Sequence, residues 1–350
     1  MNDSRPRVAA GTTLTEAVLP GVVAPDGIQI RTRPVRPAGP GQVVLAMEAA
    51  GISFAEQQMR RGKYYDQPPF PFVPGYDLVG RAVDVGEGVS AELLGRRFAV
   101  LTKTGAWSSH VTVDAADLCA VPESVDSAEA ETFVVNGITA WQMLHRLAKI
   151  RPGRTVLVHG ANGGVGSTLV QLARIAGARV VGTASAKHHD AVRALGAIPV
   201  DYRAPDLEHL LRGHAPQGYD AVFDHVGGEG IVASYRLLAA KGTLVSYGTA
   251  STRDVRGSSK APVLKLFGRL MLWNALPNGK GAHFYNIWAG RRRPATFRAA
   301  LHADLTQVLT LLADGRLVPQ VAARVPLAQV GEAVRLAESG TVVGKVVLVP

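Results

Sequence analysis

A run of glycines between an apolar segment and a helical pattern carries the clearest chemistry in the sequence. Residues 156–185 read VLVHGANGGVGSTLVQLARIAGARVVGTAS. Glycine permits a tight turn and lets backbone amides approach a pyrophosphate, while the following helix start adds free N–H groups and partial positive charge. Because apolar segments flank this unit of about 30 residues, the context is that of a dinucleotide-binding loop. The expected contacts are Gly160, Asn162, Gly163, Gly164, Val165 and Gly166; a turn without a ligand is the simpler alternative.

The residues about 20 positions beyond the loop distinguish NADPH from NADH. NAD-selective loops place an Asp or Glu there, which hydrogen-bonds to the adenosine ribose. Here that position is Thr183, and the first carboxylate after it is Asp190. Ser185 and Lys187 would hold a 2′-phosphate, by a hydroxyl contact and by charge. We therefore predict NADPH as the cofactor; the alternative, that Ser185 and Lys187 only cap the next helix, is compatible with it.

The elements that must position this loop alternate between strand and helix from about residue 130 onward. Such alternation, with mostly apolar strands, predicts a parallel sheet covered on both faces. No Gly-Lys-Ser/Thr follows the loop, so a nucleoside-triphosphate P-loop is a poor fit. Strands are expected at 155–159, 179–183, 198–202, 219–224 and 242–247, and helices at 132–149, 164–177, 187–195, 206–212 and 229–240.

The two ends of the chain differ from this segment in composition and in the spacing of their apolar residues. Residues 1–129 are rich in Val, Gly and Pro, with short apolar segments separated by glycine turns, which predicts an antiparallel, barrel-like unit. Strands are expected at 43–47, 78–85, 97–102, 109–113 and 345–349, and helices at 54–61, 297–312 and 327–338.

Composition excludes several classes of protein. The chain has 350 residues, of which 47% are hydrophobic and 19% charged, as in globular domains. A single cysteine, Cys119, excludes an internal disulfide and a multi-cysteine zinc site. There is no signal-like leader and no membrane-spanning run, so a cytoplasmic protein is expected. The net charge of +10 comes mostly from scattered arginines, which does not favour nucleic acid as a partner.

Several short motifs, taken together in their order along the chain, make the sequence resemble the medium-chain dehydrogenase/reductase superfamily. Within it, the sequence resembles the zinc-independent quinone oxidoreductase branch that includes zeta-crystallin. The resemblance covers nearly the whole chain. It implies an α/β fold with a Rossmann NADP-binding domain at 130–300, inserted into a GroES-like catalytic domain made of 1–129 and 301–350. The motifs are 51–56, 60–64, 71–75, 78–80, 136–141, the glycine loop, 201–203, 223–227, 242–248 and 344–347.

The resemblance also implies roles for individual residues. Tyr202 matches a tyrosine near the adenosine phosphate, and Ser53, Tyr64 and Thr139 match residues that line the nicotinamide end. A homodimer is implied as well. Further cofactor contacts are expected at Val226, Gly248 and Lys345.

The chain departs from the zinc alcohol dehydrogenases of the same superfamily. Those enzymes carry a cysteine near position 53 and a His-Glu pair near position 76, where this chain has Ser53, Tyr76 and Asp77. Catalytic zinc needs about three N, S or O ligands. No metal is therefore expected. Ser53 also stands where quinone reductases usually have asparagine.

Without a metal, the accessible hydride acceptors are already electron-poor, namely quinones and α,β-unsaturated carbonyls. Ser53, Tyr64 and Tyr76 are the candidate donors to the developing oxyanion. Ser53 could instead cap the helix that follows it, and Tyr76 could only pack between strands. The predicted function is reduction of a small hydrophobic quinone or enone. The alternatives are an enoyl reductase of a polyketide or other secondary-metabolite pathway and a non-catalytic NADPH-binding protein, for which the resemblance also allows RNA binding.

The segment 253–288 is long for a link before the last strand of the sheet, and it is apolar with periodic basic residues. We expect it to cover the substrate mouth or a subunit interface rather than to lie on a membrane surface. Its bulky residues favour a hydrophobic substrate: Phe267, Met271, Trp273, Phe284 and Tyr285.

Overall fold

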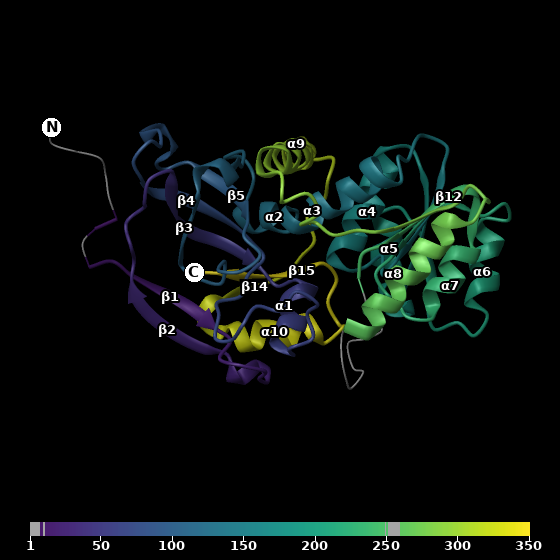
Figure 1. Ribbon diagram of the computed structural model, residues 1–350, viewed down its shortest axis with the longest axis horizontal. Helices are drawn as coiled ribbons and strands as arrows, with labels where there is room; N and C mark the ends of the chain where they lie inside the picture. Colours follow the sequence, from purple (N-terminus) through teal and green to yellow (C-terminus); the bar gives the residue numbers. More distant parts are fainter. Residues whose placement is uncertain (1–7, 10, 249, 251–259) are drawn as a thin grey trace. The chain divides into compact units, whose positions relative to one another are not determined.

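The computed structural model describes residues 8–9, 11–248, 250 and 260–350. The chain forms two compact units, one of residues 1–135 with 292–350 and one of residues 136–291 (Figure 1). These boundaries lie a few residues from those predicted from the sequence, at 129/130 and 300/301, for two physical reasons. The amide of Val135 is held by Asp77 of the first unit. The long helix that begins at Pro294 also packs within that unit, so the second boundary precedes it.

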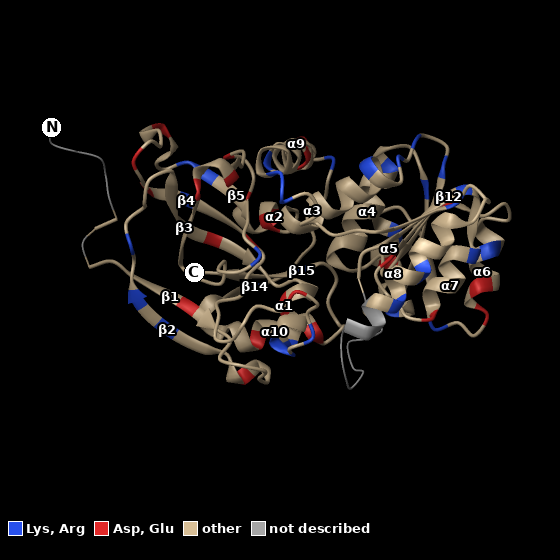
Figure 2. Ribbon diagram, in the orientation of Figure 1, with Lys and Arg blue, Asp and Glu red and all other residues tan. Residues whose placement is uncertain are grey.

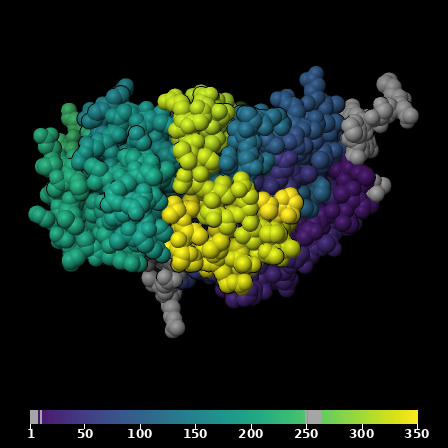
Figure 3. Space-filling model, turned by 180° about the vertical axis from the view of Figure 1, so that it is seen from behind, coloured from purple at the N-terminus to yellow at the C-terminus, as the bar shows by residue number. Residues whose placement is uncertain are grey.

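The first unit joins both ends of the chain in one sheet. Figure 3 shows the yellow C-terminal residues on the surface beside the purple and blue N-terminal ones. The strand order is β14-β15-β3-β4-β5-β7, with β6 also paired to β3. A separate hairpin of β1 (Thr13–Val18) and β2 (Gln29–Pro34) accompanies it. The sheet strands are β3 (Gln42–Gly51), β4 (Asp77–Val85), β5 (Arg97–Leu101), β6 (His110–Asp114), β7 (Cys119–Ala120), β14 (Val321–Pro326) and β15 (Lys345–Val349).

The core of the first unit forms because its central strands are apolar on the face that they share. Strand β3 is paired to β4, β6 and β15, and Val43, Leu45 and Met47 are buried along it. The indole of Trp107 fills the core and donates to the carbonyl of Gly51 at 2.9 Å. Helices α1 (Phe54–Arg60), α2 (Ser127–Glu131), α9 (Pro294–Ala313) and α10 (Val330–Glu338) complete the unit.

The second unit is a six-stranded parallel sheet with the order β10-β9-β8-β11-β12-β13. In chain order this is 3-2-1-4-5-6, the Rossmann arrangement, which confirms the predicted fold class. In such sheets ligands bind at the carboxyl ends of the strands, beside the point between β8 and β11 where the strand order reverses. The strands are β8 (Thr155–His159), β9 (Arg179–Ala184), β10 (Ile198–Asp201), β11 (Tyr219–Asp224), β12 (Leu238–Ser246) and β13 (Gly281–Phe284).

Helices cover this sheet through apolar side chains. One buried cluster joins strands β8, β9 and β11 to α6, α7 and α8, with Leu211, Ile231 and Leu266 among its members. Tyr235 stacks on Trp273 at 4.3 Å, so Trp273 belongs to this core and gives no information on the substrate. The helices are α3 (Val134–Trp141), α4 (Gly164–Ile175), α5 (His189–Ala194), α6 (Leu207–His214), α7 (Gly230–Arg236) and α8 (Lys260–Ala275).

Three local expectations differ from the structure. The helix expected at 132–149 consists of α3 and a π-helical turn at Gln142–Leu147. The helix expected at 229–240 ends at Arg236, because Leu238 already pairs with Tyr219 as β12 begins. The segment 253–288, part of which lies outside the described residues, is not a plain link: it contains α8 and also β13, the edge strand of the sheet.

Candidate cofactor and substrate site

Two glycines of the loop after β8 are required by the fold itself. Gly160 has a φ of +66°, which side chains rarely tolerate. A Cβ on Gly166 would lie 2.1 Å from the carbonyl oxygen of Gly160, so only glycine lets α4 start this close to the strand. A Cβ on Gly164 would also lie close to a neighbour, 2.6 Å from the side-chain Nδ2 of Asn136. These positions shape the loop whether or not a ligand is bound.

Gly163 differs from the other three glycines because its Cα faces open space. It is exposed, it is the N-cap of α4, and a Cβ there would contact only the Gly160 carbonyl, at 3.4 Å. Its φ of −81° suits any residue, so the local backbone does not require glycine. A ligand that approaches the first turn of α4 does require it. The neighbours Asn162 and Val165 are partly buried.

The carboxyl end of β9 provides the surroundings expected for a 2′-phosphate. Ser185 is buried, at 5% exposed, and its side chain makes no capping hydrogen bond, so the capping alternative fails for this residue. Lys187 is exposed and has no ion pair within the described part of the chain. Asp190, the first carboxylate, is 99% exposed and bound by Arg193 at 2.6 Å. A hydroxyl and an ammonium group are therefore available without a competing carboxylate.

A second basic residue belongs to the same edge and was missed by sequence reasoning. Tyr202 follows β10, and its amide donates to the carbonyl of Ala184 in β9, at 3.4 Å. Its ring is 49% exposed, with the Arg203 guanidinium 5.3 Å from the ring centre. The motif around Tyr202 contained Arg203, but only strand pairing shows that it lies beside the end of β9.

Two other predicted cofactor residues of the second unit, Val226 and Gly248, lie in the loops after β11 and β12. Val226 is 37% exposed, and its amide donates to Asp224 at 2.8 Å. Gly248 passes so close to the loop after β11 that a Cβ would lie 2.8 Å from the carbonyl oxygen of His225. Thr139 is buried in α3. Their contacts with a cofactor remain predictions.

In the first unit, a buried carboxylate controls the candidate donor Ser53. Ser53 caps α1 in a capping box: its hydroxyl and its amide both donate to Oε2 of Glu56. Oε1 of Glu56 accepts from the amide of Tyr76 at 2.7 Å. Burial raises the pKa of Glu56, while the Ser53 hydrogen bond opposes that shift. The single hydroxyl hydrogen of Ser53 is thus donated to Glu56 while Glu56 is ionised and is not free for another acceptor.

The other two candidate donors form a pair. The hydroxyl oxygens of Tyr64 and Tyr76 are 2.7 Å apart, and the rings meet edge to face. Tyr76 is buried and Tyr64 is partly exposed. Burial raises the pKa of Tyr64, and the neighbouring Tyr76 adds to the effect, so the phenol stays protonated at neutral pH. Tyr65 also hydrogen-bonds to Tyr64, so the Tyr64 hydroxyl would donate to a substrate oxygen in exchange for one of these phenol contacts.

Lys345, a predicted cofactor contact, lies in a buried ion cluster. Its ammonium is 2.7 Å from Asp77 Oδ2 and 2.7 Å from Glu131 Oε1, and all three side chains are at most 2% exposed. Burial opposes its charge, but the two carboxylates outweigh burial and raise the pKa of Lys345. Burial, with Asp77 beside it, raises the pKa of Glu131. Gly51 leaves room for the cluster, since a Cβ there would lie 2.1 Å from the lysine Cε.

Metal ligation finds no support in the geometry. Over the described ranges there is no group of three or more His, Cys, Asp or Glu side chains that could hold a metal ion. Asp77 is engaged by Lys345 and by the amide of Val135. That the protein works without a metal stays a prediction.

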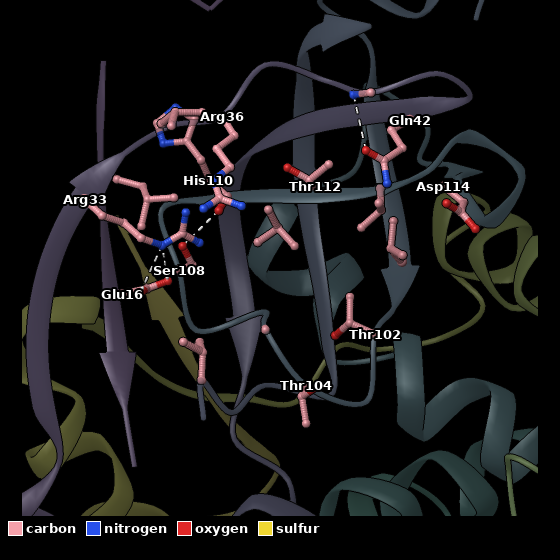
Figure 4. A pocket seen from close by; sticks show the side chains of 18 of the residues that line it. Glu16, Arg33, Arg36, Gln42, Thr102, Thr104, Ser108, His110, Thr112 and Asp114 are labelled. Atoms are coloured by element: carbon pink, nitrogen blue, oxygen red, sulfur yellow. Dashed lines mark hydrogen bonds and ion pairs between the residues drawn. The ribbon is translucent and has the colours of Figure 1, made fainter. Parts of the chain in front are cut away.

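A cavity of about 870 Å³ lies in the first unit, between the β1–β2 hairpin and strands β3, β5 and β6. Figure 4 shows Arg33 beside Glu16, with Gln42 and Asp114 on the opposite side of the view and Thr102 and Thr104 lower down between them. None of Ser53, Tyr64 and Tyr76 lines it. Elsewhere Lys and Arg are interspersed with Asp and Glu over the elements visible in Figure 2.

The fold and the glycine loop define a dinucleotide-binding oxidoreductase of two domains. Comparison with known proteins agrees: residues 39–123 match the alcohol dehydrogenase GroES-like domain, and residues 195–348 match the zinc-binding dehydrogenase domain. The chain belongs to the medium-chain dehydrogenase/reductase superfamily, which confirms the resemblance. It is 34% identical to the synaptic vesicle membrane protein VAT-1 homolog of Rattus norvegicus, over 95% of this chain and 83% of that protein.

Other similar proteins include a larger polyketide synthase and several proteins of solved structure. A mycocerosic acid synthase-like polyketide synthase of Mycobacterium tuberculosis is 31% identical over 89% of this chain, which spans 14% of that protein. Among solved structures, mycobacterial Rv1454c in complex with NADPH has a TM-score of 0.81 and 26% identity, covering 96% of this chain and 100% of that one. CurK enoyl reductase has a TM-score of 0.78 and 25% identity, covering 96% and 99%.

Of the helices described, none has the length and apolar character needed to cross a membrane.

Proposed function

We propose that this protein is an NADPH-dependent reductase of quinones or α,β-unsaturated carbonyls that uses no metal. The observation that carries the proposal is the end of β9, where Ser185 and Lys187 are available and the first carboxylate, Asp190, is already paired. A 2′-phosphate needs positive charge and hydroxyl donors, and a free carboxylate would repel it. Gly163, open in front of α4, gives the pyrophosphate access to backbone amides.

In this proposal bound NADPH supplies the hydride, and the protein binds, orients and polarises the acceptor. The Tyr64–Tyr76 hydroxyl pair is the donor that the geometry favours for the developing oxyanion. Ser53 is the weaker candidate, because Glu56 already accepts its hydrogen. Electron-poor acceptors suit such a site, since two phenols polarise a carbonyl less strongly than a metal does.

Replacement of Lys187 tests the cofactor assignment. Lys187→Ala should weaken NADPH binding about tenfold and leave NADH binding unchanged, because one charge-assisted contact is worth about 1.5 kcal/mol or more. Lys265→Ala, which removes another exposed lysine, is the matched control. Dissociation constants from fluorescence titration measure both. Equal losses for NADPH and NADH would remove the phosphate assignment.

An acceptor screen tests the reaction. NADPH oxidation followed with simple quinones, enones and enoyl thioesters side by side should give turnover with at least one class. Preference for the thioester would favour the enoyl reductase alternative, which the similarity to CurK supports. Tight NADPH binding without turnover on any class would favour a non-catalytic binding protein. The homodimer, the cytoplasmic location and the lack of nucleic-acid binding remain predictions.

A further inference from the structure

A continuous chain of hydrogen bonds crosses the carboxyl edge of the parallel sheet. The imidazole of His159, at the end of β8, has Nδ1 3.1 Å from the Thr183 hydroxyl and Nε2 3.1 Å from the Ser234 hydroxyl. Thr183 also accepts from the amide of Gly160 at 3.2 Å. Ser234 donates to Oδ2 of Asp224 at 2.6 Å. Sequence reasoning assigned no role to these side chains.

The direction of every bond in this chain follows from its two ends. Oδ1 of Asp224 accepts from the amides of Val226 and Gly227, at 2.8 and 2.9 Å, so the carboxylate is the acceptor. Ser234 donates its only hydroxyl hydrogen to Asp224 and must therefore accept from His159 Nε2–H. Nδ1 of the neutral ring is then an acceptor, which the Thr183 hydroxyl satisfies while it accepts from the Gly160 amide.

We infer that His159 is a positioning residue, held neutral as the Nε2–H tautomer, and that it couples three cofactor loops to one another. The chain fixes the amide of Gly160 in the glycine loop, the end of β9 before Ser185, and the amides of the loop after β11. These are the segments that the proposed function assigns to the dinucleotide, and the inference rests on that proposal.

Protonation of His159 disrupts the donor and acceptor directions of this hydrogen-bond chain. Both ring nitrogens would then donate, and the Thr183 hydrogen would lose its acceptor. Burial lowers the pKa of His159, and Asp224, the carboxylate that faces it through Ser234, opposes part of that shift. Because the pKa is lowered on folding, the neutral ring makes its full contribution to folding stability above its ordinary pKa of about 6.5. That contribution is lost as pH falls through the lower pKa of the folded protein. Cofactor affinity should fall in the same direction.

The first test uses two variants of Thr183. Thr183→Val keeps the shape but leaves the Gly160 amide and His159 Nδ1 without a partner, and should weaken NADPH and NADH alike by about tenfold. Thr183→Ser, which keeps the hydroxyl, should stay within about twofold of wild type. Unchanged affinity in Thr183→Val, with wild type binding normally, would overturn the inference and leave the proposed function intact.

The second test reads the ring directly on the cofactor-free protein. Long-range ¹H–¹⁵N NMR should show the Nε2–H tautomer for His159, whether or not the protein binds NADPH. The NADH dissociation constant, which avoids titration of a 2′-phosphate, should rise below pH 6.5 in wild type and stay flat in His159→Gln. The Nδ1–H tautomer, or the same pH profile in both proteins, would refute the role. Failure of wild type to bind either coenzyme would instead contradict the proposed function.

A second proposal rests on the cavity of Figure 4, which is independent of the dinucleotide edge. Glu16, 2% exposed, is shared by the guanidinium groups of Arg31 and Arg33, so two cations meet one carboxylate. Arg36 adds a third cation and makes no ion pair with any residue that the structure describes. At the other end, Arg298 binds both Asp114 and Asp117, at 2.8 and 2.6 Å. The hairpin end of the cavity therefore carries excess positive charge.

We propose that this cavity binds a small molecule bearing phosphate or carboxylate groups. A buried carboxylate that fixes two half-exposed arginines preorganises them for an anion, which a guanidinium binds through paired N–H groups. Burial lowers the pKa of His110, so this ring stays neutral at pH 7 and adds no charge. A volume of about 870 Å³ is within the range of small-molecule sites, and Thr102, Thr104 and Thr112 are among the other residues that line it.

Calorimetric titration tests this site with pyrophosphate and with citrate, in saturating NADP⁺ to occupy the dinucleotide site. At least one probe should bind wild type, and Arg33→Gln and Arg36→Gln should each weaken it about tenfold. Arg324→Gln, which removes an exposed arginine elsewhere in the unit, should bind like wild type. The probe that binds distinguishes phosphate from carboxylate. No binding of either probe, or equal binding by all variants, would overturn the proposal.

Discussion

The two units use charged and polar side chains in opposite ways. At the edge of the parallel sheet, Lys187 is exposed and has no ion pair with any described residue, and Gly163 of the glycine loop faces open space. In the first unit, Lys345 and Glu56 are buried and fully engaged with neighbouring groups. The residue types are similar, but burial decides their use: a buried charge must be paired, whereas an exposed one is free to meet a ligand.

Removal of the buried lysine should give the largest effect. Lys345→Met leaves Asp77 and Glu131 without their counter-ion and should cost about 3–5 kcal/mol of the free energy of unfolding. Lys187→Met, at an exposed position, should leave that free energy within about 0.5 kcal/mol of wild type. Urea denaturation measures both. A similar loss in the two variants would show that the contrast between the units is wrong.

Two glycines of one loop sharpen the comparison within the second unit. Gly166→Ala forces a Cβ against the Gly160 carbonyl and should cost about 1–3 kcal/mol of stability. Gly163→Ala has room for its methyl group and should keep the stability of wild type, yet raise the NADPH dissociation constant. Thermal unfolding and NADPH titration separate the two effects. Normal NADPH binding by Gly163→Ala would mean that no ligand approaches this turn.

Replacement of Glu56 tests how much a buried carboxylate, held by Ser53 and the Tyr76 amide, contributes to the stability of the first unit. Glu56→Ala removes the acceptor of Ser53 and of the Tyr76 amide and should cost about 1–3 kcal/mol. Because the folded pKa of Glu56 is raised, its contribution to stability is greatest below the unfolded pKa and falls as pH rises through the folded one. The unfolding free energy of Glu56→Gln should therefore fall less than that of wild type between pH 4.5 and pH 7. Identical pH profiles would contradict this assignment.

The smallest effect is expected at the phenol pair. Tyr64→Phe should lower kcat about tenfold with a quinone while the melting temperature stays near that of wild type, since one neutral hydrogen bond is worth about 1 kcal/mol. Because the pKa of Tyr64 is raised, wild-type activity should not decline through this group as pH rises to 9. Unchanged kcat in Tyr64→Phe would remove the phenol pair from the proposed chemistry.

The dinucleotide site was largely predictable because its signals are local. Glycine spacing, flanking strands and the absent acid lie within one unit of about 30 residues, and their chemistry depends on the backbone. Arg203 was missed because its place beside β9 follows from strand pairing. The sequence could not connect His159, Thr183, Ser234 and Asp224 through hydrogen bonds, since three of them lie in different strands and Ser234 lies in α7.

The sequence by itself therefore determined the fold class, the family and the location of the cofactor loop, because periodicity and glycine spacing act over short distances. Only the tertiary structure decided that Glu56 is buried against the amide of Tyr76, that Lys345 is enclosed by two carboxylates and that Lys187 has no ion pair with any described residue. The physical reason is that the partner and the burial of a polar group depend on residues far away in the chain. Those two quantities determine whether a charge stabilises the protein or remains available to a ligand.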